Sequence, residues 1–354
     1  MPLEKPLPTP SQFKACLLGG AVGDVLGAPV EFDSRAEILR SYGSQGITDY
    51  DVAYDRLGAI TDDTQLTLFT AEGLLRAQVR HDHKGLCHLP SVVSHAYLRW
   101  LETQGYRAAA PGVTPDGILF LNPELHARRA PGTTCLQSLA TATRFGQPAS
   151  NNSKGCGAIM RIAPVALFAS ARELSEDWVF QTSVEISALT HGHPTGQIAS
   201  AFFALLLYWL LKGYRLEAAL HQSCLYCYRL PGTDETLHAV DRAIALSQTA
   251  PSGQRLAELG EGWVADEALA IALYCSLVGE RFEDAVVLAV NHSGDSDSTG
   301  LLTGNIRGIT DGLDALPERW LRDLELKELI STVAEDLYNL DTQSKETWQR
   351  YPGY

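Results

Sequence analysis

The sequence predicts an all-α fold in which the functional residues lie on the loops between helices. Apolar residues recur at spacings of three and four along nearly the whole chain, which is the period of an amphipathic helix. Alternating patterns typical of strands are hard to find. Asp, Ser or Thr precede several apolar runs and glycine follows others, as at Gly213 and Gly279, in agreement with helix start and stop signals. A length of 354 residues leaves room for one large domain or two ordinary ones, with ample material for a buried core.

The periodic segments give the expected helices in chain order. They span residues 13–26, 63–78, 92–101, 159–171, 178–189, 197–212, 216–228, 235–247, 266–277, 282–290 and 324–337. Two long segments interrupt them. Residues 29–60 contain Glu31 and four aromatic side chains, and residues 104–134 contain four prolines and four glycines. Because irregular loops of this length in a compact domain are usually functional or disordered, we expect both to lie over a site.

Composition and charge exclude several classes of protein. The net charge of -14 argues against general binding to nucleic acid or to anionic membranes. The most apolar stretch, residues 198–211, is short for a membrane span and suits a buried core helix. Residues 1–10 hold four prolines and no apolar signal region, so a cytoplasmic location is expected.

The cysteines and the last residues carry no clear functional signal. Seven scattered cysteines indicate reduced core thiols, because a disulfide framework needs an even set. Cys224 and Cys227 form a single C-x-x-C within a helical pattern, with no second pair to complete a zinc site, and are expected in the core. The polar tail from Asp341 is expected on the surface.

An acidic turn, residues 292–299, directly follows the apolar run 285–290. In a loop that leads into a helix, Asp295, Asp297 and the Ser298 hydroxyl can converge on one hard cation such as Mg²⁺. The competing interpretation is structural, because Asp and Ser are preferred N-cap residues and a single turn of this kind is more often a cap.

A second acidic turn, Thr61-Asp62-Asp63-Thr64, also opens an apolar segment. A helix N-terminus favours one aspartate there, but the second carboxylate is left without a capping role. A close pair of carboxylates repels by up to about 4 kcal/mol at intermediate dielectric. A fold that gathers four aspartates therefore needs a counter-charge, and two such turns favour a metal site over two caps.

Residues 151–161 are typical of an anion cradle, because small residues with free backbone N–H groups lead into a helix expected to begin near Ala158. A diphosphate would fit on Ser153, Gly155, Cys156, Gly157 and Ala158. The order of Gly, Lys and Ser is not that of a Walker A loop. A flexible turn before a core helix explains this segment equally well.

Two further segments have both a functional and a structural interpretation. His191 and His193 precede the long core helix and could be zinc ligands or part of a helix cap. No Cys or His partner stands at metal-ligand spacing, so contact with a base or ribose is the better functional interpretation. Residues 19–31 run from a helix into a glycine-rich turn that ends at Glu31, which could reach a metal or a bound water. Asp24 in this segment would equally serve as a buried structural acid, and tight helix packing also explains the glycines.

Four motifs in this order make the chain resemble the ADP-ribosylglycohydrolase family, the group named for the enzyme that removes ADP-ribose from dinitrogenase reductase. The motifs are Gly23-Asp-Val-Leu-Gly-Ala-Pro-Val-Glu31, Thr61-Asp-Asp-Thr64, Ser153-Lys-Gly-Cys-Gly-Ala-Ile-Met-Arg161 and Gly294-Asp-Ser-Asp-Ser298. The resemblance spans residues 13–315 and implies a compact single-domain orthogonal helical bundle over residues 1–354, with two Mg²⁺ or Mn²⁺ ions.

Position by position, the resemblance implies roles for individual side chains. The metal ligands would be Thr61, Asp62, Asp63, Asp295, Asp297 and Ser298. The substrate would contact the cradle, Met160 and His191, which belongs to a family-like Thr-His pair, and Glu31 falls where the family has a mobile acid. The family commonly has threonine at Ser298 and asparagine at Cys156, so a side-chain hydrogen bond at Cys156 is in doubt.

The resemblance implies a metal-dependent hydrolase that cleaves the bond at the anomeric ribose carbon of an ADP-ribosylated protein or other conjugate and releases ADP-ribose. The catalytic candidates are Glu31, Asp62, Asp63 and Asp297, and the sequence does not choose the general base. An arginine-linked N-glycosidic bond is the first expectation. The alternatives are a non-catalytic ADP-ribose-binding or crystallin-like member of the same fold, and a different metal-dependent nucleotide hydrolase.

Overall fold

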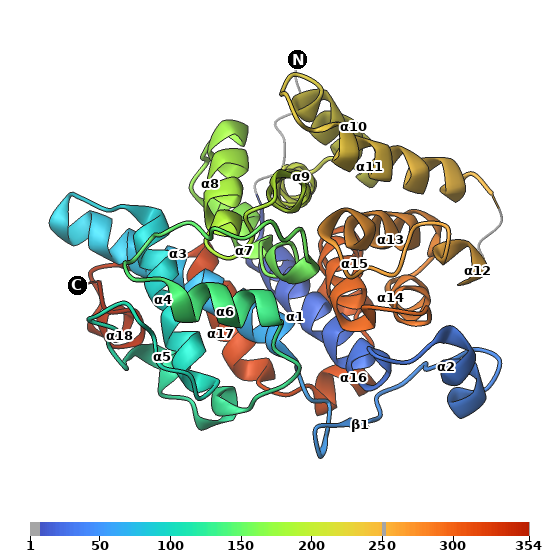
Figure 1. Ribbon diagram of the computed structural model, residues 1–354, viewed down its shortest axis with the longest axis horizontal. Coiled ribbons are helices and arrows are strands. Elements are labelled where there is room, and N and C mark those ends of the chain that lie inside the picture. The colour runs from blue at the N-terminus through green and yellow to red at the C-terminus, as the bar shows by residue number, and fades with distance from the viewer. Residues whose placement is uncertain (1–7, 250–252, 354) are drawn as a thin grey trace.

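Helices α1 (Pro10–Gly27) and α15 (Ser296–Asp311) form the centre of the protein in the computed structural model, which describes residues 8–249 and 253–353 (Figure 1). Thr9 starts α1 through a capping box with Gln12. The two helices touch backbone to backbone, because a Cβ built at Gly23 would lie 2.0 Å from the Gly300 carbonyl oxygen. Close packing of these glycines places the end of α1 beside the start of α15.

The other elements pack around this pair. In chain order they are η1 Ala28–Val30, α2 Arg35–Tyr42, β1 Val52–Ala53, β2 Arg56–Leu57, α3 Asp62–Lys84, α4 Leu89–Thr103, α5 Gly117–Phe120, η2 Pro123–His126, α6 Thr133–Thr141, η3 Cys156–Ala158, α7 Ala163–Ala171, α8 Glu176–Ala188, α9 Pro194–Leu211, α10 Leu216–Cys227, α11 Asp234–Ser247, α12 Gly253–Leu256, α13 Ala265–Val278, α14 Phe282–Val290, η4 Leu313–Ala315, α16 Glu318–Asp323, α17 Lys327–Tyr338 and α18 Lys345–Arg350. In the part of the chain that the structure describes, the two short strands pair only with each other. The prediction of an all-α fold is confirmed.

The larger helices pack around α1 and α15 and on one another (Figure 1). Helices α13 and α14 pack on α15, α17 packs on α1 and α3, and α9 joins α7, α8, α10 and α13. Both α1 with its η1 extension and α9 are long and apolar enough to cross a membrane, but 89% and 83% of their apolar windows are buried inside the protein. They are therefore packed as core helices here, as predicted for residues 198–211.

Neither long interruption is a continuous irregular loop. Residues 29–60 contain α2, whose capping box joins Ser34 to Glu37, and residues 104–134 contain α5 and η2. Of the side chains on α2 only Ile38 is buried, so this helix has no apolar period for sequence analysis to detect.

Two expected helix boundaries and the expected position of the end of the chain's tail were wrong for identifiable reasons. Helix α7 begins at Ala163 and not near Ala158, with Pro164 in its first turn. Helix α17 begins at Lys327 and not at residue 324, because Leu326 before it has a left-handed backbone (φ 56°). The tail from Asp341 lies mostly at the surface as expected, but its end is buried, and the Tyr351 hydroxyl donates to Asp336 Oδ2 at 2.7 Å.

Candidate active site

One cavity of about 200 Å³ brings most of the predicted site residues together. Those lining it are Glu31, Asp62, Asp63, Gly155, Cys156, Gly157, Met160, His191, Asp295, Asp297 and Ser298. Thr61 and Ala158 are buried behind its wall, and Ser153 lines a neighbouring cavity with Thr134. Four segments far apart in sequence therefore meet at one place.

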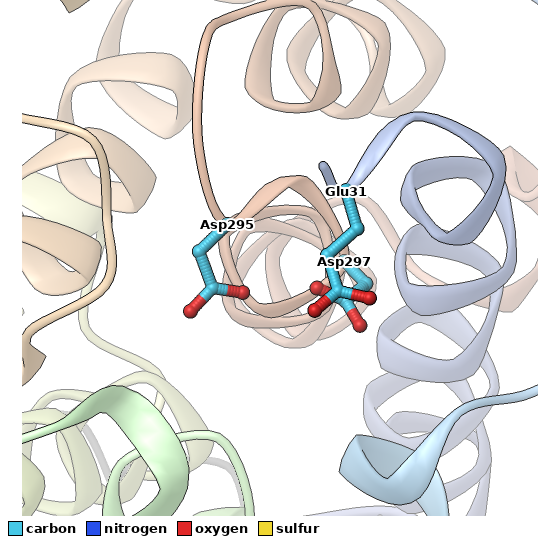
Figure 2. Close-up of side chains that lie close together, drawn as sticks. All are labelled: Glu31, Asp295 and Asp297. Atoms are coloured by element: carbon cyan, nitrogen blue, oxygen red, sulfur yellow. The ribbon is translucent and has the colours of Figure 1, made fainter. Parts of the chain in front are cut away.

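Three carboxylates form the closest cluster in this cavity. Each of Glu31, Asp295 and Asp297 offers one oxygen, and these oxygens lie within 4.8 Å of one another. Figure 2 shows Glu31 reaching from the end of η1 toward α15, where Asp295 is the N-cap residue and Asp297 lies in the first turn. Glu31 Oε2 and Asp295 Oδ2 are buried and have no hydrogen-bond partner among the described residues.

The electrostatics of the cavity are those of a site that needs a cation. Burial, followed by repulsion from Asp297, raises the pKa of Glu31 to about 11. Burial also raises the pKa of Asp62, Asp63 and Asp295 well above the ordinary range. No lysine or arginine is among the residues that line the described cavity. Hard oxygen donors with two unpartnered atoms fit a divalent ion such as Mg²⁺ or Mn²⁺.

Asp24 supports the acidic turn of residues 61–64 from the side away from the cavity. Its carboxylate is fully buried and accepts hydrogen bonds from the backbone N–H groups of Thr61 and Thr64, both at 3.1 Å. Burial, with a contribution from Asp297, raises its pKa to about 7. Asp24 is thus a structural acid, one of the two interpretations that the sequence left open.

A buried ion pair between Arg129 and Glu325 holds the backbone next to Asp62 in place. Arg129 Nη2 donates to Glu325 Oε1 at 2.9 Å, and Arg129 Nη1 donates to the Ile60 carbonyl at 2.9 Å. Asp62 in turn donates its N–H to the Arg129 carbonyl at 3.2 Å and accepts from the Gly132 N–H at 3.3 Å. Sequence analysis did not find this buried ion pair, because its members stand 196 positions apart.

Ser298 joins the two acidic turns directly. Its hydroxyl donates to Asp63 Oδ2 at 2.7 Å, although 235 positions separate the two residues in sequence. Thr61 caps α3 by accepting from the Asp63 N–H at 3.2 Å. The capping role and the cavity-facing carboxylates therefore coexist in the same turn.

The expected cradle offers fewer free donors than the sequence indicated. The N–H of Cys156 donates to the Trp263 carbonyl at 3.1 Å, and that of Gly155 to Ser153 Oγ at 3.3 Å. The turn is the short helix η3 and does not lead straight into α7. Gly157 lies between Cys135 and His191, with room for no more than a hydrogen.

His191 presents a neutral ring to the cavity. Burial, together with the positive charge of Arg161, lowers its pKa to about 3. Arg161 Nη2 donates to Thr190 Oγ1 at 2.5 Å, and Thr190 Oγ1 forms a hydrogen bond with His191 Nδ1 at 2.8 Å. This contact holds the ring in place, and His191 lines the cavity as a neutral hydrogen-bonding group.

An aromatic pair stands at the rim of the cavity. Trp263 lines it, and Phe32, the residue after Glu31, stacks on Trp263 with ring centroids 6.0 Å apart and an interplanar angle of 17°. Phe32 is 72% exposed. Sequence analysis placed residues 29–60 over the site but gave no signal for Trp263.

Fold and site together define a class: an all-α protein with a small acidic cavity built from the loops and first turns of several helices. The comparison with known proteins makes this class specific, because the model of the ADP-ribosylglycohydrolase family matches residues 6–347. The chain belongs to this family. The predictions of family and of an enzyme of the ADP-ribosylhydrolase class are thereby confirmed.

Relatives with assigned names agree. The ADP-ribosyl-[dinitrogen reductase] glycohydrolase of Rhodospirillum rubrum is 27% identical over 315 residues, covering 88% of this chain and 89% of that protein. The ADP-ribosylarginine hydrolase Tri1 of Serratia proteamaculans is 25% identical over 92% of this chain and 78% of its own. A solved structure described as an ADP-ribosylglycohydrolase-related protein complex superposes with a TM-score of 0.66 at 29% identity, covering 93% of this chain and 97% of that one.

Proposed function

We propose that the protein removes ADP-ribose from a modified target by hydrolysing the bond at the anomeric ribose carbon. The observation that carries the proposal is the single cavity that gathers both acidic turns, Glu31 and His191. Family membership supplies the class of reaction, and the intact acidic set favours a catalyst over a protein that only binds ADP-ribose.

The residues proposed to hold the metal are Thr61, Asp62, Asp63, Asp295, Asp297 and Ser298. Glu31 joins this set as a candidate, since its oxygen clusters with those of Asp295 and Asp297. A bound divalent cation, or a pair of them, would neutralise the carboxylates, orient ribose hydroxyls and lower the pKa of a water.

The chain's own groups supply the remaining chemistry. Departure of the leaving group gives the ribose carbon oxocarbenium character, which nearby carboxylates stabilise. One of Glu31, Asp62, Asp63 and Asp297 accepts the proton of the attacking water. Nε2 of His191 hydrogen-bonds the substrate, and the diphosphate lies along the turn formed by residues 153–158, where Gly155, Cys156 and Gly157 line the cavity.

An arginine-linked substrate is the first choice. A guanidinium leaving group carries positive charge, and the five carboxylates that line the cavity would keep a net negative charge beside it even with two divalent cations bound. The relative named ADP-ribosylarginine hydrolase supports the same choice.

Paired peptides test the proposal. ADP-ribosylarginine and ADP-ribosylserine peptides are incubated with the protein, with Mg²⁺ or with chelator, and released ADP-ribose is measured by chromatography. Release from the arginine peptide only, and only with metal, is expected. Release from the serine peptide alone would support hydrolase activity but reject the arginine linkage. If neither peptide released ADP-ribose and the protein still bound free ADP-ribose, the result would favour a non-catalytic ADP-ribose-binding protein.

A further inference from the structure

A second and larger cavity, of about 610 Å³, lies at the other end of α3. Helices α3 and α4 and the tail residues Pro352 and Gly353 form its walls, on the side of the protein where α18 lies (Figure 1). Arg76 stands fourteen positions after Asp62 on α3, which at ~1.5 Å per residue puts the two about 21 Å apart. The cavity is therefore separate from the acidic site, and its volume is that of a small-molecule pocket.

Its lining is cationic in a protein of net charge -14. Arg76, Arg80 and Arg99 all line it. Two carboxylates balance them: Glu72 pairs with Arg76 at 3.0 Å and with Arg99 at 3.2 Å, and Asp116 pairs with Arg76 at 2.8 Å. Arg80 forms no ion pair with any residue that the structure describes. One positive charge thus remains unbalanced at the cavity wall.

Two of these guanidinium groups also have buried donors without a partner. Arg99 is fully buried and Arg76 is 3% exposed. Arg99 Nη1 and Arg76 Nε have no hydrogen-bond partner among the described residues. These two donors are shielded from the cavity, whereas Arg80 is only partly buried, so an anion that enters the cavity can form charge-assisted hydrogen bonds with Arg80.

A flat surface lies beside the arginines. The rings of His95 and Phe145 stack with centroids 4.5 Å apart and an interplanar angle of 15°, and both line the cavity. The Thr114 N–H donates to His95 Nε2 at 3.1 Å, so the neutral ring keeps a donor on Nδ1. Leu86 and Val92 complete an apolar part of the lining. The cavity thus combines a place for an anion with a place for a planar ring.

We propose that this cavity binds a phosphate ester the size of a nucleoside monophosphate, with the phosphate on Arg80 and the planar ring against His95 and Phe145. The site goes beyond the proposed hydrolase function and does not depend on it. Adenosine monophosphate is the probe, because it carries both chemical parts.

Titration calorimetry on the full chain in chelator tests the proposal. Adenosine monophosphate should bind the wild type, inorganic phosphate should bind at least tenfold more weakly, and adenosine should not bind. Arg80→Ala removes the unpaired charge without breaking the buried Glu72 pairs, and should weaken binding about tenfold or more. Arg242→Ala, at an exposed position on α11, is the matched control and should leave the affinity unchanged.

Two further variants identify where the probe binds. Gly157→Val obstructs the acidic cavity and should leave the affinity for adenosine monophosphate within twofold. If Gly157→Val instead lost this affinity while Arg80→Ala kept it, the nucleotide would bind in the acidic cavity and the proposal would be overturned. Binding that appears only when Tyr354 is deleted would show that this residue competes for the cavity, and would likewise overturn it. Equal affinities for inorganic phosphate and the nucleotide would reject the nucleotide-sized ligand.

Discussion

Glu31 lies in a four-residue connection between η1 and α2, which is shorter than the long loop expected from sequence. Its carboxylate is 6% exposed and points at the cluster of Asp295 and Asp297 (Figure 2). Because Phe32 stacks on Trp263, a movement of the backbone that carries Glu31 out of the cavity would also separate these rings. A gating role for Glu31 therefore couples the carboxylate to the aromatic rim.

Glu31→Gln keeps the size of the side chain and removes its charge. If Glu31 gates the site or accepts a proton, this variant should lose turnover by about 100-fold, within the range for general acid–base catalysis. Binding of ADP-ribose, measured by calorimetry, should stay within a few-fold, and so should metal-dependent stabilisation. Phe32→Ala is the control for the rim alone. Loss of metal-dependent stabilisation in Glu31→Gln would show that Glu31 is a metal ligand. Turnover at the wild-type rate would show that Glu31 has no catalytic role.

Gly157 and Cys156 give a matched pair in the expected cradle. A Cβ at Gly157 would lie 2.9 Å from Cys135 Sγ and 3.1 Å from His191 Cε1, so Gly157→Val displaces the wall of the cavity. Cys156→Ala keeps the backbone N–H that bonds to Trp263. Calorimetry with ADP-ribose should show a loss of at least tenfold for Gly157→Val and a mild change for Cys156→Ala. Equal affinities would place the diphosphate elsewhere.

At this scale, sequence analysis found the residues that stand in contiguous motifs. Asp62, Asp63, Asp295 and Asp297 are conspicuous because adjacent acids have few structural uses. Arg129 and Glu325 are single charges in unremarkable surroundings, and only the fold brings them together. The same is true of Trp263, whose neighbours in sequence are ordinary.

The contact between α1 and α15 is the element on which the site depends. Gly19, Gly23 and Gly27 face Gly304, Gly300 and Ser296 in turn, with each Cβ position already occupied by backbone of the other helix. Since Asp297 is in the first turn of α15 and Glu31 follows α1, any separation of the helices moves these carboxylates apart. Backbone packing thus sets the spacing of the cluster.

Gly300→Ala tests this dependence. The new methyl would lie 2.4 Å from the Gly23 carbonyl oxygen, and overpacking of this kind costs about 1–3 kcal/mol. Chemical denaturation should show that loss, and metal titration followed by thermal shift should show weaker binding. His221→Ala, on the exposed face of α10, should change neither quantity. Unchanged metal affinity in Gly300→Ala would separate helix packing from the geometry of the site.

Sequence analysis missed helices in which glycines or charged residues stand where a regular spacing of apolar residues would be needed to detect them. Helix α15 did not stand out as a periodic segment because Gly300, Gly304 and Gly308 occupy its packing face, although the expected helical entry of Asp295 and Asp297 is correct. Helix α2 is mostly exposed and polar. The other long buried helices were found because their apolar spacing reports burial directly.

At the scale of the whole molecule, metal should control stability and turnover together. Chelation should abolish hydrolysis, and metal at about 100 times its dissociation constant should add about 2.7 kcal/mol to the free energy of unfolding. Asp297→Asn should lose both effects, which denaturation with and without Mg²⁺ would measure. Full turnover in excess chelator would reject the proposed mechanism.

The metal effect should also depend on pH. The folded-state pKa values of Asp24, about 7, and Glu31, about 11, lie above those of the unfolded chain. Such groups stabilise the metal-free protein below about pH 4, and this contribution is lost as the pH rises toward the folded values. The difference in Tm between Mg²⁺ and chelator should therefore grow from about pH 5 to about pH 8. A difference that is constant or shrinks would contradict the acidic cluster as the metal site.

The pairing of α1 with α15 has a consequence for synthesis of the protein. Domains fold as the chain leaves the ribosome, N-terminal part first. Helix α1 is made at the start, but its principal partner ends at Asp311, so its glycine face stays uncovered until nearly the whole chain has emerged. Long-range pairing of this kind slows folding. We therefore expect the nascent chain to expose this apolar segment through most of translation, and chaperones to bind the segment during that interval.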